Sequence, residues 1–165
     1  MKLSFTTYRI FLKHPFGISR SSNNWYDIVL IFLKDGNIIG RGEAAPSIRY
    51  KESTEKILSV LSKGIDIPDV ESMNLEMMQR LIYPQLGNYK SLKAAFSMAL
   101  WDWWSQQKQV PLWKHLGCKN TNSIQTSFTI AIGNIEEIEK KIIEADSYNI
   151  LKVKLGTPND DKKII

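Results

Sequence analysis

Two lysines near the end of the chain have the type and spacing for proton-transfer chemistry. The segment 151–156 reads Leu-Lys-Val-Lys-Leu-Gly, and strand alternation puts Lys152 and Lys154 on one face and the aliphatic side chains on the other. Each ammonium group disfavours protonation of the other, and burial acts in the same direction. A lysine held neutral in this way can remove a proton from a substrate. An edge strand with one solvated face would show the same alternation, so the neighbouring elements must decide between the two interpretations.

The elements around the lysine pair favour the chemical interpretation. In chain order, we expect a strand at 123–133, a helix capped by Asn134, the lysine strand at 149–156 and a new helix start at 157–160. Strand, helix, strand and helix with short connections are typical of parallel β/α units. The lysines then lie at the carboxyl end of a parallel strand, where (β/α) barrels carry their chemistry. An edge strand is not expected inside such a series.

The first 120 residues follow a different pattern, typical of an antiparallel meander with helices. We expect strands at about 2–13, 26–34 and 38–44. A polar, flexible loop is expected at 14–24, and the dipeptide Asp35-Gly36 suits a two-residue turn. Helices are expected at about 53–64, 70–82 and 91–109. The sequence thus predicts an α+β domain at 1–120, followed at 121–165 by the first β/α units of a TIM-like barrel. Two barrel strands leave uncovered edges, so we expect the barrel to be truncated.

Composition and charge exclude several classes of protein. The formal charge is +5, but the basic residues are spread over the whole chain, so no nucleic-acid surface is expected. The longest apolar run, at 28–33, is far too short for a membrane span, and the start of the chain lacks the apolar stretch of a signal peptide. Cys118, the sole cysteine, cannot form an internal disulfide, which fits a reducing compartment. We expect a cytoplasmic protein with no nucleic-acid or membrane partner.

Several segments carry a family resemblance that covers essentially all 165 residues. The main ones are GRGEAAP at 40–46, KAAFSMALWDWWSQQKQVPLWKHLG at 93–117 and LKVKLG at 151–156. Together they resemble the muconate-lactonizing branch of the enolase superfamily. Within it, HPFGISRSS at 14–22 and FTIAIG at 128–133 are most similar to the dipeptide epimerases, of which the L-Ala-D/L-Glu epimerases are the best known.

The resemblance implies a fold and a reaction. Residues 1–120 would be the capping domain, and the reaction would be a 1,1-proton transfer alpha to a carboxylate, through an ene-diolate that Mg²⁺ stabilises. Lys154 would be the acid/base on one face of the substrate, and Lys152 would help hold the substrate carboxylate. In this family the opposing lysine and the carboxylate metal ligands lie on later barrel strands, so no metal ligand is expected in this chain. We therefore expect the isolated 165-residue chain to be inactive.

The resemblance also implies four substrate-binding residues for a dipeptide. Arg20 would pair with the distal carboxylate by a charge-assisted fork, although a loop arginine can equally be solvated. Phe16 and Tyr50 would wall the pocket, and Thr129 would face the substrate, with ordinary packing or exposure as the alternatives. The remaining polar candidates are interpreted as structural or surface residues: Glu43, Asp102, His14 and His115.

Other functions fit parts of the same pattern. An o-succinylbenzoate synthase or a muconate cycloisomerase would use the same lysines for elimination or cycloisomerisation. A protein of another class, a non-catalytic binding or assembly module, would expose the unfinished barrel edge to a partner. The sequence does not define the oligomeric state, and a homo-oligomer of the full-length protein is compatible with it.

Overall fold

The computed structural model describes residues 1–18, 21–68, 74–119 and 123–156, with the backbone alone at 16–18 and 21. The chain divides into two compact units. The first comprises Met1–Ile10 and Asp27–Lys119, and the second comprises Phe11–Tyr26 and Asn120–Ile165. The outer half of the first hairpin therefore groups with the C-terminal elements. The division into domains at residue 120 stays a prediction.

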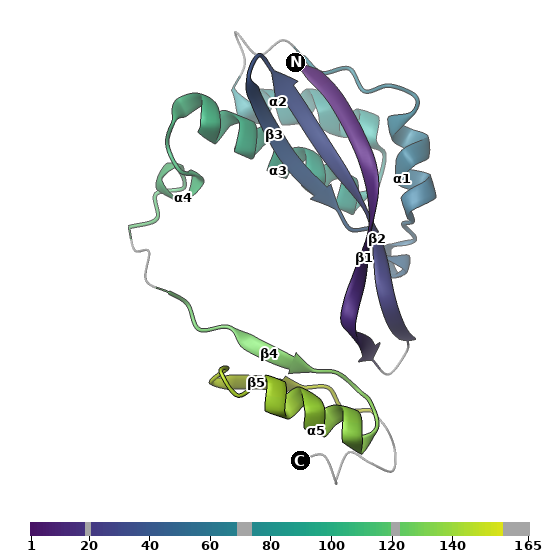
Figure 1. Ribbon diagram of the computed structural model, residues 1–165. Coiled ribbons are helices and arrows are strands. Elements are labelled where there is room, and N and C mark those ends of the chain that lie inside the picture. The colour runs from purple at the N-terminus through teal and green to yellow at the C-terminus, as the bar shows by residue number, and fades with distance from the viewer. Residues whose placement is uncertain (19–20, 69–73, 120–122, 157–165) are drawn as a thin grey trace. The chain divides into compact units, whose positions relative to one another are not determined.

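The sheet of the first unit is the predicted three-stranded meander (Figure 1). Its strands, in spatial order, are β1 (Lys2–Ile18), β2 (Ser21–Asp35) and β3 (Ile38–Ala44). Strands β2 and β3 pair antiparallel from Val29↔Ala44 to Asp35↔Ile38. Gly36 closes the predicted turn with φ of 55°. This left-handed conformation is one that glycine adopts without steric cost.

The predicted loop at 14–24 is wrong over most of its length. Strand β1 continues to Ile18 and β2 begins at Ser21, so the first hairpin is much longer than its apolar patterning indicates. In a hairpin, the backbone N–H and C=O groups of one strand satisfy those of the other, whatever the side chains are. Polar residues such as Ser22 and Asn23 can therefore be part of a strand without an apolar face to bury.

The helices of the first unit largely confirm the predicted ones. They are η1 (Ile48–Tyr50), α1 (Thr54–Leu61), α2 (Leu75–Ile82), η2 (Tyr83–Leu86), α3 (Lys90–Lys108) and α4 (Leu112–His115). The helix predicted from about residue 70 is not continuous to residue 82, because Asn74 is extended and α2 begins at Leu75; residues 70–73 lie outside the described part. The Asn74 side chain accepts a hydrogen bond from the Met77 N–H and caps the helix there. No helix in the described ranges is both long and apolar enough to cross a membrane.

The core of the first unit lies between the sheet and the helices, with α3 packed along β3 (Figure 1). Phe96, Leu92 and Leu100 of α3 are fully buried, together with Ile31 and Leu33 of β2. A Cβ added at Gly42 would meet the carbonyl oxygen of Ala95. Glycine at this position therefore lets the strand and the helix backbone come into direct contact.

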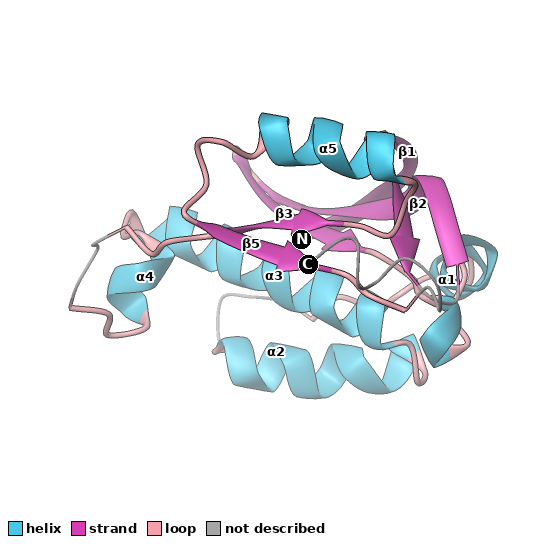
Figure 2. Ribbon diagram, turned by 90° about the horizontal axis from the view of Figure 1, so that it is seen from below, coloured by secondary structure: helices cyan, strands magenta, loops and turns pink. Residues whose placement is uncertain are grey.

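The second unit contains the predicted strand, helix and strand, of which the helix α5 and the second strand β5 are labelled in Figure 2. Strands β4 (Ser127–Ile130) and β5 (Ile150–Val153) pair in parallel, and α5 (Ile135–Glu144) connects them. Asn134 and Glu137 form a capping box at the start of α5. Both strands are shorter than predicted, because a strand is defined only where its partner supplies hydrogen bonds. The helix expected after residue 156 lies outside the described residues.

Candidate active site

Thr129, Lys152 and Lys154 share one face of the two-stranded parallel sheet. The register pairs Thr129 of β4 with Lys152 of β5, and residues paired in parallel strands point to the same side. Lys154 directly follows β5, and its N–H donates to the carbonyl oxygen of Ile130 at 2.9 Å. This hydrogen bond extends the pairing beyond Val153 and keeps Lys154 on the face of Lys152.

Helix α5 packs on the opposite face of this sheet, against β4. Ile130 is 1% exposed and packs in a cluster with Ile138 of α5 and Ala145, the residue that follows the helix. Because Ile130 neighbours Thr129, strand alternation puts their side chains on opposite faces. The helix therefore lies on one side and the lysines on the other, as expected for a barrel strand whose polar side chains face the interior.

The lysine face is cationic and accessible. Lys152 is exposed and Lys154 is partly buried. Neither lysine has an ion-pair partner within the described residues. Two ammonium groups on one strand face, beside the Thr129 hydroxyl, can bind a carboxylate by charge-assisted hydrogen bonds. We call Thr129, Lys152 and Lys154 the lysine face.

The other predicted site residues lie in the first unit or have side chains outside the described part of the chain. Tyr50 belongs to the first unit, at the end of η1, and is 53% exposed. Phe16 lies in β1 within the second unit, but its side chain is outside the described part. Arg20 also lies outside the described residues. Its proposed carboxylate contact, like the substrate contacts of Phe16 and Tyr50, stays a prediction.

A polar cluster that the sequence did not predict connects the outer hairpin to α5 within the second unit. The Glu144 carboxylate lies 2.6 Å from His14 Nε2 and 3.1 Å from Lys13 Nζ. The hydrogen bond from His14, and then that from Lys13, lowers the pKa of Glu144 below its ordinary 4.5. His14 is thus a structural residue, as expected. The sequence carries no signal for this contact because 130 positions separate His14 from Glu144.

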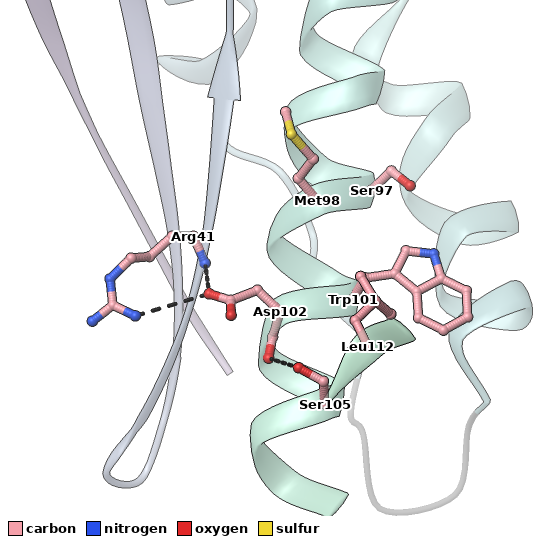
Figure 3. A pocket seen from close by; sticks show the side chains of 7 residues that line it. All are labelled: Arg41, Ser97, Met98, Trp101, Asp102, Ser105 and Leu112. Carbon is pink, nitrogen blue, oxygen red and sulfur yellow. Dashed lines mark hydrogen bonds and ion pairs between the residues drawn. The ribbon is translucent and has the colours of Figure 1, made fainter. Parts of the chain in front are cut away.

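A surface pocket of about 300 Å³ on the first unit contains none of the predicted site residues. Its walls come from β3, α3 and the start of α4: Arg41, Ser97, Met98, Trp101, Asp102, Ser105 and Leu112 (Figure 3). The Asp102 carboxylate accepts a hydrogen bond from the Arg41 backbone N–H at 2.8 Å, which confirms its predicted structural role. With that carboxylate engaged, the pocket offers mainly apolar surface, and we assign it no chemistry.

The described residues do not fit a magnesium site. Among them, no three His, Cys, Asp or Glu side chains come close enough together to hold a metal ion. The lysine face offers two cations and a hydroxyl, whereas Mg²⁺ is held by carboxylates, phosphates and water. The described part of the chain therefore supplies two cations and a hydroxyl on one face, and not the ligand set of a metal.

Comparisons with known proteins agree with this fold. The chain is 29% identical over 167 residues to the L-Ala-D/L-amino acid epimerase of Pedosphaera parvula, a match that covers 97% of this chain and 47% of that protein. It is 31% identical over 156 residues to the L-Ala-D/L-Glu epimerase of Clostridium acetobutylicum, covering 88% and 42% respectively. The chain thus spans less than half the length of these relatives.

A solved structure resembles the whole chain. It is the dipeptide epimerase from Methylococcus capsulatus, complexed with Mg and the dipeptide L-Arg-D-Lys. The TM-score is 0.81 at 25% identity, over 98% of this chain and 47% of that chain. The family model for the N-terminal domain of mandelate racemase / muconate lactonizing enzyme matches residues 3–117. On this match, the chain belongs to the mandelate racemase / muconate lactonizing enzyme family.

Proposed function

We propose that this chain supplies the amino-terminal part of a dipeptide epimerase, which inverts a carbon alpha to a carboxylate by 1,1-proton transfer. One observation carries the proposal: Lys152 and Lys154 share a face with Thr129 at the carboxyl end of a parallel strand, opposite the covering helix. The relatives named above, which are epimerases of dipeptides or of L-Ala-D/L-amino acids, support the same reaction class.

Each residue of the lysine face has a proposed role. Lys154 removes or returns the alpha proton on one face of the substrate, in its neutral and charged forms respectively. The ammonium group of Lys152 binds the substrate carboxylate, which orients the alpha carbon toward Lys154. The Thr129 hydroxyl, on the adjacent strand, donates a hydrogen bond to the same carboxylate. Arg20, Phe16 and Tyr50 are proposed to contact the rest of the dipeptide.

The proposal includes Mg²⁺, but it assigns the metal ligands to residues outside the described part of this chain. When bound, Mg²⁺ would stabilise the negative charge of an ene-diolate. Its ligands are not found among the described residues, and an opposing acid/base on the second substrate face is also required. We therefore expect the 165-residue chain alone not to turn over substrate.

The decisive experiment measures alpha-proton exchange by the protein that the native gene encodes. L-Ala-L-Glu is incubated with this protein in ²H₂O, and ¹H NMR follows the loss of the glutamyl alpha-proton signal. Lys154→Met should lower the exchange rate by on the order of 10²-fold to 10⁴-fold, the usual contribution of a general acid/base. Lys140→Met is the matched control, because Lys140 is exposed on α5 and the substitution changes the net charge equally.

A substrate panel separates the epimerase from its alternatives. Exchange on dipeptides that Lys154→Met abolishes supports the proposal. Turnover of muconate, or of the precursor of o-succinylbenzoate, without dipeptide exchange would replace it by a cycloisomerase or a synthase. If the native protein acts on none of these substrates, the proposal is wrong and a binding or assembly role becomes the better account.

We also infer a cytoplasmic location for this enzyme. Cys118 is an exposed free thiol, which suits a reducing compartment. Dipeptides released during peptide turnover would be available to an epimerase there. Fractionation of the native cells, with an antibody to this chain, tests the location.

A further inference from the structure

We propose that Lys90 and Glu52 are positioning residues that hold the exposed ring of Tyr50 in a fixed orientation. The inference rests on the proposed function, in which Tyr50 contacts the dipeptide. All three residues belong to the first unit, so the contacts that carry the inference lie within one compact body.

The ammonium group of Lys90 lies over the face of the Tyr50 ring. Lys90 Nζ is 4.9 Å from the ring centroid, which is within the range of a cation–π interaction. The ring itself remains 53% exposed, so the contact occupies one part of its surface and leaves the rest accessible. A ligand that meets the exposed part of Tyr50 also meets the positive charge of Lys90.

Glu52 holds the backbone at the start of α3, where Lys90 lies. Its side chain is buried, at 3% exposure, and one carboxylate oxygen accepts a hydrogen bond from the Lys90 backbone N–H at 2.5 Å. The Ser91 N–H lies 3.3 Å from the other oxygen. The residue before α3, Tyr89, makes no side-chain capping bond, so Glu52 supplies the cap from 38 positions away. A carboxylate at a helix N-terminus is also favoured by the helix dipole.

The segment that joins Tyr50 to Glu52 is a hydrogen-bonded turn. The N–H groups of Tyr50 and Glu52 both donate to the carbonyl oxygen of Ser47, at 2.9 and 3.1 Å. Lys51, between them, has a left-handed φ of 59°, and its carbonyl oxygen accepts a hydrogen bond from Lys56 Nζ at 2.8 Å. This turn directs Glu52 into the protein and leaves Tyr50 at the surface.

Lys90 thus contacts both ends of the turn. Its backbone binds Glu52, and its side chain covers Tyr50. An aromatic ring held in this way loses little conformational freedom when a ligand packs on it, so binding costs less entropy. The adjacent ammonium also favours a ligand with a negative group near the ring over one with a positive group.

The test compares two substitutions of Lys90 in the native gene product. Lys90→Met removes the charge but keeps the backbone N–H that Glu52 binds, and Lys90→Arg keeps a cation that can stack on the ring. Lys108→Met is the matched control, because Lys108 is exposed at the other end of α3. These variants leave the buried Glu52 in place, so α3 should fold in each.

Two readouts follow the variants. The first is the ¹H NMR shift of the residue 90 side chain and of the Tyr50 ring, assigned with Tyr50→Phe. Lys90→Met should lose the Tyr50 ring shift of the wild type, and Lys90→Arg should retain most of it. The second is steady-state epimerisation of L-Ala-L-Glu. Lys90→Met should raise KM by about threefold to tenfold with kcat within about twofold, as expected for lost uniform binding.

The two readouts separate this inference from the proposed function. An unchanged ring shift in Lys90→Met overturns the positioning role, whatever the activity is. An altered ring shift with an unchanged KM, or the same KM rise in Lys108→Met, overturns its role in substrate binding. If the wild-type protein does not epimerise any dipeptide, the proposed function fails while the ring shift still tests the contact between Lys90 and Tyr50.

Discussion

The Glu144 carboxylate accepts hydrogen bonds from His14 and Lys13 of the outer hairpin. The pKa of Glu144 therefore shows whether these contacts form. His14 and Lys13 both belong to β1, and Glu144 is the last residue of α5. Because the contacts stabilise the carboxylate, they lower the pKa of Glu144. The stability that this contact contributes is therefore fully present above the ordinary carboxyl pKa. It is lost as the pH falls through the lowered pKa of Glu144 in the folded protein.

A carboxylate titration tests the Glu144 contact. The ¹³C NMR shift of the Glu144 carboxylate should show a midpoint below 4.5 in the wild type. His14→Ala should raise this midpoint, since the hydrogen bond from His14 is the largest cause of the shift, and Lys13→Met should raise it less. A midpoint at or above 4.5 in the wild type would contradict the contact.

At the scale of elements, the close packing of β3 on α3 explains two glycines. A Cβ at Gly40 would meet the carbonyl oxygen of Ala99, and one at Gly42 would meet that of Ala95. Both obstacles are helix backbone, which cannot move aside as a side chain would. Gly40 and Gly42 are two residues apart, so strand alternation points their Cβ positions to the same face, toward α3. A hydrogen atom occupies each of these positions.

Gly42→Ala should lower the free energy of unfolding by about 1–3 kcal/mol, because the added methyl group forces β3 away from α3. Urea denaturation followed by tryptophan fluorescence measures this loss. Gly36→Asn is the control: Gly36 has φ of 55° and open space around it, and asparagine tolerates that conformation. Equal losses in the two variants would show that the β3–α3 contact is not the cause.

Considering the molecule as a whole, the described residues of the second unit bury few apolar side chains. Its buried apolar cluster consists of Ile130, Ile138 and Ala145, whereas Leu151 and Val153 of β5 are each 42% exposed. A parallel sheet normally buries both faces. Further β/α units, whose helices pack on the faces of a parallel sheet, would cover these side chains, as the proposed epimerase requires.

The intact mass of the protein from its native source tests this requirement. Since the chain has a mass of 19.0 kDa and spans 47% of a relative, we expect about 40 kDa for the native protein. A native mass of 19.0 kDa would contradict the proposal that this protein is an active epimerase. It would favour the binding or assembly module, which should then be monodisperse in solution.

Features that depend on neighbours along the chain can be read from the sequence alone. The cap at Asn134 and the Asp35-Gly36 turn are set by a few consecutive residues, and the structure confirms both predictions. The alternation of Lys152 and Lys154 is equally local, so their shared face could be predicted. Their roles, and those of Arg20, Phe16, Tyr50 and Thr129, remain proposals.

Features that join distant segments became visible only in the folded chain. The strand structure at 14–18 and 21–24 depends on backbone pairing between two strands, which side-chain polarity does not reveal. The contacts of Glu52 with Lys90 and of His14 with Glu144 join residues 38 and 130 positions apart. Such pairs carry no local signal, because their free energy arises only when folding places two charged or polar groups within hydrogen-bonding distance.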